Sequence, residues 1–290
     1  MRSASDRIRS VGLGITGFVL LGTFWELIKI VGDGKRRFGV NTDNASMPHL
    51  ATVLRAFGEE EVRGQGRTVG AAVLSGGWFS FRLAVGGFVL GVGYGLLLAM
   101  LLQRFKLAER AWLPYVVLSQ TVPLIALAPL IAGWGGQIKL FGHQWTSWMS
   151  VVGMAAYLSF FPATIGALRG FNSAEPASVE LMDSYGASWW QTMRKLRLPA
   201  AVPHLMPALK LAAAASVVGA IVSEISIGLP NGIGRLIIDY FQKASGDPAR
   251  VFSAFLGAGV LGLVVSGLVM GLEKFLTRNL SRRRVGAVEL

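Results

Sequence analysis

The sequence predicts an all-α membrane protein with six transmembrane helices, and three observations lead to that prediction. Hydrophobic residues make up 52% of the 290 residues and charged residues only 15%, whereas a soluble domain carries about 25% charged residues. The apolar residues gather in long runs, each sufficient for the ~20 residues that cross a bilayer. Glycine occurs 37 times, as is usual in membrane helices, where small residues let backbones approach. This composition excludes a soluble enzyme and a disordered chain.

Polar or basic residues bound each apolar run. The first run follows a basic start; it is too long for the apolar part of a signal peptide and no small-residue cleavage site follows it, so we expect a retained membrane helix. Residues 32–80 are polar, and we expect a solvated loop with some surface helix. Residues 228–250 are expected to form a second loop. The predicted membrane helices cover residues 11–31, 81–102, 113–134, 147–168, 204–227 and 251–275.

The distribution of basic residues predicts that both termini are cytoplasmic. That orientation places sixteen Lys and Arg inside and, once the long first loop is set aside as a weak topology signal, four outside. The net charge of +12 then reflects topology and contact with membrane lipid headgroups rather than nucleic acid. Because the chain has no cysteine, disulfides, thiolate nucleophiles and cysteine-bound metals are excluded.

Three glycines at four-residue intervals, Gly87, Gly91 and Gly95, lie in the second predicted helix. Val92-Gly-Tyr-Gly95 resembles the filter of a potassium channel, in which backbone carbonyls surround the ion. The preceding residue is glycine rather than threonine, and no separate pore helix comes before it. A small-residue face for close helix packing is the better interpretation.

The most informative segment is the polar connection 169–203 between the fourth and fifth predicted helices. Glu180 is followed six residues later by Gly186 and, after nine more residues, by Leu196-Arg-Leu-Pro199. This spacing resembles the cytoplasmic signature of binding-protein-dependent ABC importer permeases: Glu-Ala-Ala, three residues, Gly, nine residues, Ile-x-Leu-Pro. Leu181 and Met182 stand at the paired alanines and Leu196 at the isoleucine, which keeps an apolar face for packing on a partner.

The proline-bearing run 121–129 and Gly232-Ile-Gly234 are similar to the nitrate, sulfonate, taurine and thiamine-precursor branch of that family. The resemblance implies a type I importer permease fold in a prokaryotic cytoplasmic membrane. It also implies a second permease copy or a homologous permease, two cytoplasmic ATPase subunits that bind ATP and magnesium, and an extracytoplasmic solute-binding protein. This chain would then hold no cofactor and no catalytic residue. The implied solutes are an alkanesulfonate or taurine, nitrate, a pyrimidine thiamine precursor, or riboflavin.

On this resemblance the chain divides into three parts. Residues 1–80 are an N-terminal membrane helix and an extracytoplasmic loop, residues 81–277 a permease core with a coupling loop at 169–203, and residues 278–290 a basic cytoplasmic tail. Within the coupling loop we expect a short amphipathic helix over 178–185, a tight turn at Gly186, and a proline, Pro199, that stops the next helix from running back. The expected ATPase-coupling residues are Glu180, Asp183, Ser184, Tyr185, Gly186, Ala187, Leu198 and Pro199.

Polar residues inside the third and fifth predicted helices are candidates for a substrate pathway, because polar groups and prolines are costly within a bilayer. The candidates are Ser119, Gln120, Pro123, Ser216, Ser223 and Glu224. The alternative is that the small residues of the fifth helix serve packing, and that Glu224 pairs with a basic loop residue such as Arg235. Both interpretations stay open at this stage.

An ion-gradient-driven secondary transporter is the main alternative function. It requires an intramembrane charge relay and usually an inverted repeat, but the sequence offers only Glu224 and no clear repeat. A membrane-embedded enzyme requires a cluster of acids, bases or metal ligands, which the scattered His49, His143 and His204 do not supply.

Overall fold

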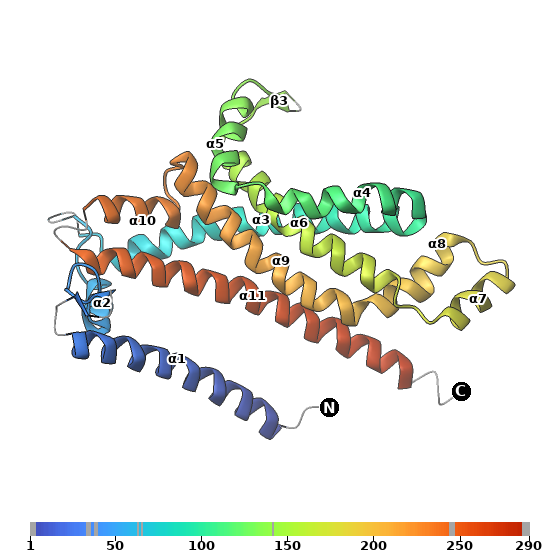
Figure 1. Ribbon diagram of the computed structural model, residues 1–290, viewed down its shortest axis with the longest axis horizontal. Coiled ribbons are helices and arrows are strands. Elements are labelled where there is room, and N and C mark those ends of the chain that lie inside the picture. Colours follow the sequence, from blue (N-terminus) through green and yellow to red (C-terminus); the bar gives the residue numbers. More distant parts are fainter. Residues whose placement is uncertain are drawn as a thin grey trace. The chain divides into compact units, whose positions relative to one another are not determined.

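The computed structural model describes residues 4–32, 36–37, 40–62, 64, 66–140, 142–243 and 247–285. Residues 1–3 and 286–290, at the outer ends of the first and last predicted parts, lie outside this range. The described chain is mostly helical (Figure 1). Its strands are two antiparallel pairs of two residues each, β1 (Arg36–Arg37) with β2 (Val40–Asn41) and β3 (Lys139–Leu140) with β4 (His143–Gln144). Among the described residues, five helices are long and apolar enough to cross a membrane, or six if one bent pair counts as a span, which confirms the predicted fold class.

The chain forms two compact units, and helices α3 (Val69–Arg104), α10 (Ile233–Gln242) and α11 (Pro248–Val285) each pass from one unit into the other. The first unit combines residues 1–74 with 236–256. It contains α1 (Ala4–Gly32) and α2 (Leu50–Ala56), together with parts of the three shared helices. The second unit combines residues 75–235 with 257–290 and holds the remaining helices.

In the first unit, the polar segment after α1 folds back onto the end of that helix. The Lys29 ammonium donates to Thr42 O and to Asn44 Oδ1, at 2.8 Å each. The Glu26 carboxylate accepts from Leu50 N at 2.7 Å and lies 2.8 Å from His49 Nδ1. Within the described part of the predicted loop, charged groups of α1 therefore hold residues 42–50 against the end of that helix.

In the second unit, α6 (Ser147–Phe171) packs between α3 and α9 (Leu198–Ile227), and α6 and α9 run side by side (Figure 1). Small residues make this possible. A Cβ atom on Gly219 of α9 would lie 2.9 Å from Ala155 Cα of α6, and one on Gly87 of α3 would lie 2.9 Å from Ala156 N of α6. The two glycines therefore let both neighbouring helices approach the backbone of α6.

Several of the predicted helices prove longer than expected, because the helical pattern continues past their apolar runs. Helix α3 begins at Val69 rather than at residue 81, with Thr68 Oγ1 accepting from Ala71 N at 3.2 Å. Helix α11 continues to Val285, so the described part of the predicted basic tail is helical. The expected loop 228–250 also contains α10.

The third predicted membrane segment is a bent pair of helices rather than one continuous helix. It consists of α4 (Lys106–Leu118), a short turn η1 (Ser119–Thr121) and α5 (Leu124–Gly135), with a bend of 99°. Pro123 is the cause, since it cannot donate a hydrogen bond and disfavours helical geometry in the residue before it. Val122 accordingly has φ −72° and ψ 124°.

Pro199 does not stop the helix from running back toward the N-terminus, contrary to expectation. A continuous helical stretch runs from Trp189 to Ile227 through α8 (Trp189–Thr192), the π-helical turn η2 (Met193–Arg197) and α9. Pro199 occupies the first turn of α9. The wider π turn directly before it gives the proline ring the space that a regular α turn lacks.

Candidate functional site

The connection between α6 and α9 carries a short exposed helix, α7 (Pro176–Ser184), beyond the ends of both (Figure 1). It begins with a proline in its first turn, where no donor is needed. None of its residues is buried, and Leu181 is 56% and the adjoining Tyr185 81% exposed. Apolar and aromatic side chains so exposed outside the membrane helices are typical of a surface that another protein covers.

Gly186 closes α7 with a Schellman turn. The Gly186 N–H donates to Asp183 O at 2.9 Å and the Ala187 N–H to Met182 O at 3.0 Å, the hydrogen bonds that define this motif. Gly186 has φ +67°, and no atom lies within 4 Å of where its Cβ would stand. Glycine is therefore favoured by the backbone conformation and not by lack of space.

A capping box starts the next helix immediately after this turn. The Gln191 N–H donates to Ser188 Oγ at 3.4 Å, and the Ser188 N–H donates to Gln191 Oε1 at 2.7 Å. The first helical residue, Trp189, donates its indole N–H to Gln103 Oε1 of α3 at 2.9 Å. The Arg104 guanidinium lies 5.2 Å from the centre of a Trp189 ring, a cation–π distance.

The far end of this segment is fixed to α6. Arg197 Nη1 donates to Phe171 O, the last residue of α6, at 3.0 Å. A buried cluster surrounds the junction and draws on α3, α6, η2 and α9. Its members are Ala99, Leu102, Ala167, Leu168, Phe171, Met193 and Ala201. The ends of these helices therefore form one packed block next to α7.

The predicted coupling residues fall into two groups. Glu180, Asp183, Ser184, Tyr185, Gly186 and Ala187 lie together on α7 and its closing turn, whereas Leu198 and Pro199 lie in the first turn of α9, beyond α8 and η2. The sequence motifs did not indicate the residues that fasten this segment, which are Gln103, Arg104, Trp189 and Arg197. The Ser188-x-x-Gln191 capping box was the available signal, because it marks a helix start at Trp189.

The predicted pathway residues also separate into two groups. Ser119, Gln120 and Pro123 lie at the break between α4 and α5, where Gln120 and Pro123 are exposed. The Tyr157 hydroxyl of α6 donates to Ser119 O. Ser216, Ser223 and Glu224 of α9 are fully buried.

The Glu224 carboxylate fastens the segment after α9 to α3. Glu224 Oε2 accepts from the Ser80 hydroxyl at 2.8 Å and from Gly234 N at 2.9 Å, and Ser80 Oγ accepts from Ile233 N at 2.9 Å. A Cβ on Gly234 would lie 2.8 Å from Glu224 Cβ, so glycine is required for this close approach. The donors to Glu224 in the described residues are neutral groups, rather than the arginine considered above.

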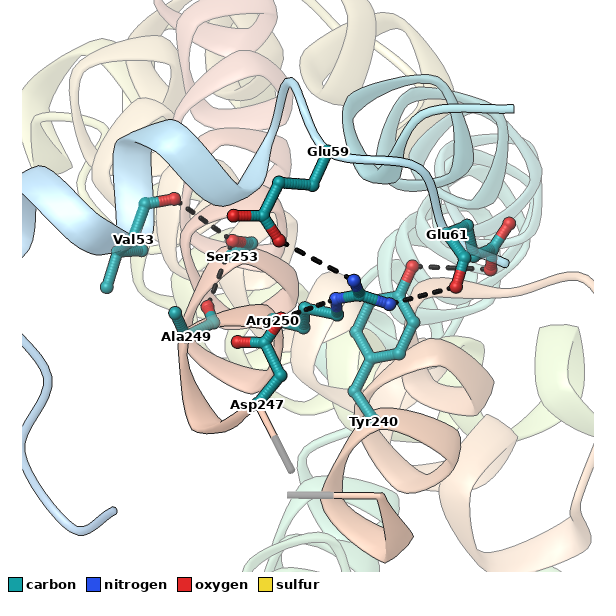
Figure 2. A network of polar contacts seen from close by, with 8 residues as sticks. All are labelled: Val53, Glu59, Glu61, Tyr240, Asp247, Ala249, Arg250 and Ser253. Atoms are coloured by element: carbon teal, nitrogen blue, oxygen red, sulfur yellow. Dashed lines mark hydrogen bonds and ion pairs between the residues drawn. The ribbon is translucent and has the colours of Figure 1, made fainter. Parts of the chain in front are cut away.

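A separate polar network lies within the first unit and centres on Arg250 of α11 (Figure 2). Arg250 Nε donates to Asp247 Oδ2 at 2.7 Å, Nη1 donates to Glu61 O at 2.9 Å, and Nη2 lies 3.5 Å from Glu59 Oε2. The Tyr240 hydroxyl donates to Glu61 Oε1 at 3.2 Å. Burial, with the charge of Glu61 adding to it, raises the pKa of Tyr240. Arg250 of α11 and Tyr240 of α10 thus join both helices to the segment before α3 in this unit.

The sequence is similar to several transport proteins. The formylaminopyrimidine transport permease protein ThiX of Halalkalibacterium halodurans is 32% identical over 65% of this chain and 67% of its own length. The putative aliphatic sulfonates transport permease protein SsuC of Bacillus subtilis is 28% identical over 68% of this chain and 67% of its own length. The riboflavin transport system permease protein RibX of Chloroflexus aurantiacus is 31% identical, with 67% and 68% covered.

A solved structure shares the fold. The crystal structure of an amino acid ABC transporter with histidines aligns with a TM-score of 0.53 and 22% identity, covering 72% of this chain and 94% of that one. The profile of the family described as "Binding-protein-dependent transport system inner membrane component" matches residues 91–282, which include α7, the Gly186 turn and Glu224. The chain therefore belongs to this family of inner membrane transport components.

Proposed function

We propose that this chain is the permease subunit of an ATP-driven importer, and that it receives a small organic solute from an extracytoplasmic binding protein and releases it into the cytoplasm by alternating access. Two permease subunits, identical or homologous, would assemble with two cytoplasmic ATPase subunits. ATP and magnesium would bind to those ATPases, and both termini of this chain would face the cytoplasm. The solute would be a sulfonate, nitrate, a pyrimidine thiamine precursor or a riboflavin-like heterocycle. The relatives whose names specify sulfonates, formylaminopyrimidine and riboflavin support this range.

The observation that carries this proposal is the exposed α7 with its Schellman turn. A short helix with exposed Leu181 and Tyr185 offers a docking surface, and the turn at Gly186 sets the direction in which α8 leaves it. A displacement of α7 by an ATPase would then be transmitted to the membrane helices through the rigid turn at Gly186. Glu180, Asp183 and Ser184 on α7, and Leu198 and Pro199 at the other end of the segment, would complete the coupling region.

The Gly186→Val variant tests the joint. A side chain in the left-handed region costs about 1–2 kcal/mol, and branching at Cβ adds to this. Gly186→Asn is the matched control, because asparagine tolerates this conformation. In the reconstituted importer we expect the valine variant to insert and bind the ATPase but to move about tenfold less solute per ATP hydrolysed, while the asparagine variant stays near wild type. Equal coupling in both variants would contradict the role of the turn.

For the substrate pathway we propose the break between α4 and α5, where Gln120 and Pro123 are exposed and Ser119 is half-buried. Ser216, Ser223 and Glu224 would line or support the path from α9. Exposed amide and hydroxyl groups suit brief, weak contacts that allow release. Gln120→Ala should alter solute uptake and leave ATPase binding intact, and unchanged uptake in both Gln120→Ala and Glu224→Ala would remove this assignment.

Partners can be identified by purifying the full chain in mild detergent and analysing co-purifying proteins by mass spectrometry. We expect a stoichiometric ATPase subunit, and the permease chains present will distinguish a homodimer from a heterodimer. An ATPase-free protein that is stable across detergents would favour a secondary transporter. Uptake measured with each of the four solute classes would then identify the cargo.

A further inference from the structure

We propose that Trp189 is a positioning residue that fastens the coupling segment, residues 176–199, to the end of α3. A displacement of α7 is then passed to α3 as well as to α9. The proposal rests on the proposed coupling role of α7. It adds a second route for the movement, one that the covalent chain does not provide.

Contacts on three sides hold the Trp189 side chain. Its indole N–H donates to Gln103 Oε1 at 2.9 Å. The Arg104 guanidinium lies over its ring at 5.2 Å, and the side chain also packs against the buried cluster that contains Leu102, Phe171 and Met193. Gln103 and Arg104 are consecutive residues at the end of α3, so both polar contacts are with the last turn of that helix.

The position of Trp189 in the chain makes it the first point of contact after α7. It is three residues beyond Gly186 and directly follows the cap Ser188. Movement that leaves the Gly186 turn therefore meets α3 through Trp189 before it has passed along α8 and η2 to α9.

The covalent route to α9 is less stiff than a regular helix. It passes through the π turn η2 and then Pro199, both of which interrupt the regular α-helical hydrogen bonding. The Arg197 contact with Phe171 O fixes the end of that route to α6. Trp189 and Arg197 thus secure the two ends of the segment to two different membrane helices.

The first test measures the position of the segment in the full permease alone. Because the chain has no cysteine, Leu101→Cys on α3 and Arg194→Cys on η2 provide unique sites for spin labels, and both side chains are exposed. Trp189→Phe keeps an aromatic ring and removes the N–H, and Gln103→Leu removes the acceptor. In each we expect the population outside the wild-type distance peak to rise about fivefold, the factor that corresponds to a hydrogen bond of ordinary strength. Unchanged distance distributions in both variants would overturn the proposal.

The second test measures solute moved per ATP hydrolysed in the reconstituted importer. Trp189→Phe and Gln103→Leu should each lower this ratio about fivefold, and the double variant should lower it no further, because both remove the same contact. Gln103→Glu retains an acceptor oxygen and should restore the ratio. Trp148→Phe, at the opposite end of α6 from Phe171, is the matched control and should behave as wild type.

The two tests separate this proposal from the proposed function. A shifted distance distribution with an unchanged coupling ratio would refute the transmission role of Trp189. A wild-type complex without ATP-dependent transport would refute the proposed function. The distances between the labels do not depend on solute or ATPase. They therefore test the contact between Trp189 and Gln103 whether or not the proposed function holds.

Discussion

Replacing Gly91 with alanine should weaken the packing of α3 against α6, whereas the same replacement at Gly93 should not. A Cβ on Gly91 would lie 3.0 Å from Ala156 Cα and closer still to Ala156 O and Ser159 Oγ. The Ser159 side chain can rotate, but the Ala156 carbonyl belongs to the backbone of α6 and cannot. Around Gly93 no atom lies within 4 Å of the Cβ position.

The magnitude follows from two opposing contributions. Ordinary carbon–oxygen contact requires the helices to separate by about 1 Å, and overpacking of this kind costs about 1–3 kcal/mol. Alanine gains about 1 kcal/mol over glycine in a helix, and this gain is the same at both positions. The difference between the two variants therefore isolates the contact, and we expect it to be about 1–3 kcal/mol in favour of Gly93→Ala.

The assay is thermal unfolding in detergent, followed by intrinsic tryptophan fluorescence or by an environment-sensitive dye that does not react with thiols. A difference of about 2 kcal/mol corresponds to roughly 4–8 °C in Tm for a chain of this size. Equal Tm values for Gly91→Ala and Gly93→Ala would refute the close approach of α3 and α6. A fall in Tm at Gly93 alone would do so as well.

Three further predictions concern buried and networked polar groups. Glu224→Gln keeps an acceptor for Ser80 and should lower Tm less than Glu224→Ala, which leaves buried donors unsatisfied at about 1–3 kcal/mol each. Arg250→Lys should lower the stability of the first unit by about 1 kcal/mol, measured by local proteolysis, since one ammonium cannot reproduce the three-sided contact of the guanidinium. Because the pKa of Tyr240 is raised, the folded state keeps the phenol proton longer than the unfolded state. Its contribution is therefore present below about pH 10 and lost above it, and Tyr240→Phe should flatten the alkaline decline in Tm.

The features that sequence predicted well depend on short-range patterns. Apolar runs located the membrane helices, because crossing a bilayer requires a minimum apolar length. The spacing from Glu180 to Pro199 predicted a short helix and its closing turn at Gly186, because a helix, its closing turn and the next helix start each need residues at fixed separations. The glycine spacing in α3 predicted a packing face, and the contacts of Gly87 and Gly91 with α6 confirm it.

The break at Pro123 could not be predicted in the same way. Pro114, Pro129 and Pro162 all lie inside helices, so the presence of proline alone does not distinguish a break from a tolerated residue. The distinction depends on which group satisfies the backbone that a break releases. At this break the Tyr157 hydroxyl, 38 residues away, donates to Ser119 O, a partner that only the tertiary structure reveals.

The role of Glu224 illustrates the same limit and bears on the pathway. Its neighbour Ser80 is 144 residues distant in the sequence, so a regular spacing of small residues around Glu224 could suggest either a polar path or a packing face. In the fold, Glu224 Oε2 already accepts from Ser80 and Gly234, and its side chain is fully buried. A solute that bound this oxygen would have to displace donors that hold the segment between α9 and α10. Gln120, which is exposed at a break in its helix, meets a passing solute without that cost, and it is therefore the stronger of the two candidates for direct contact.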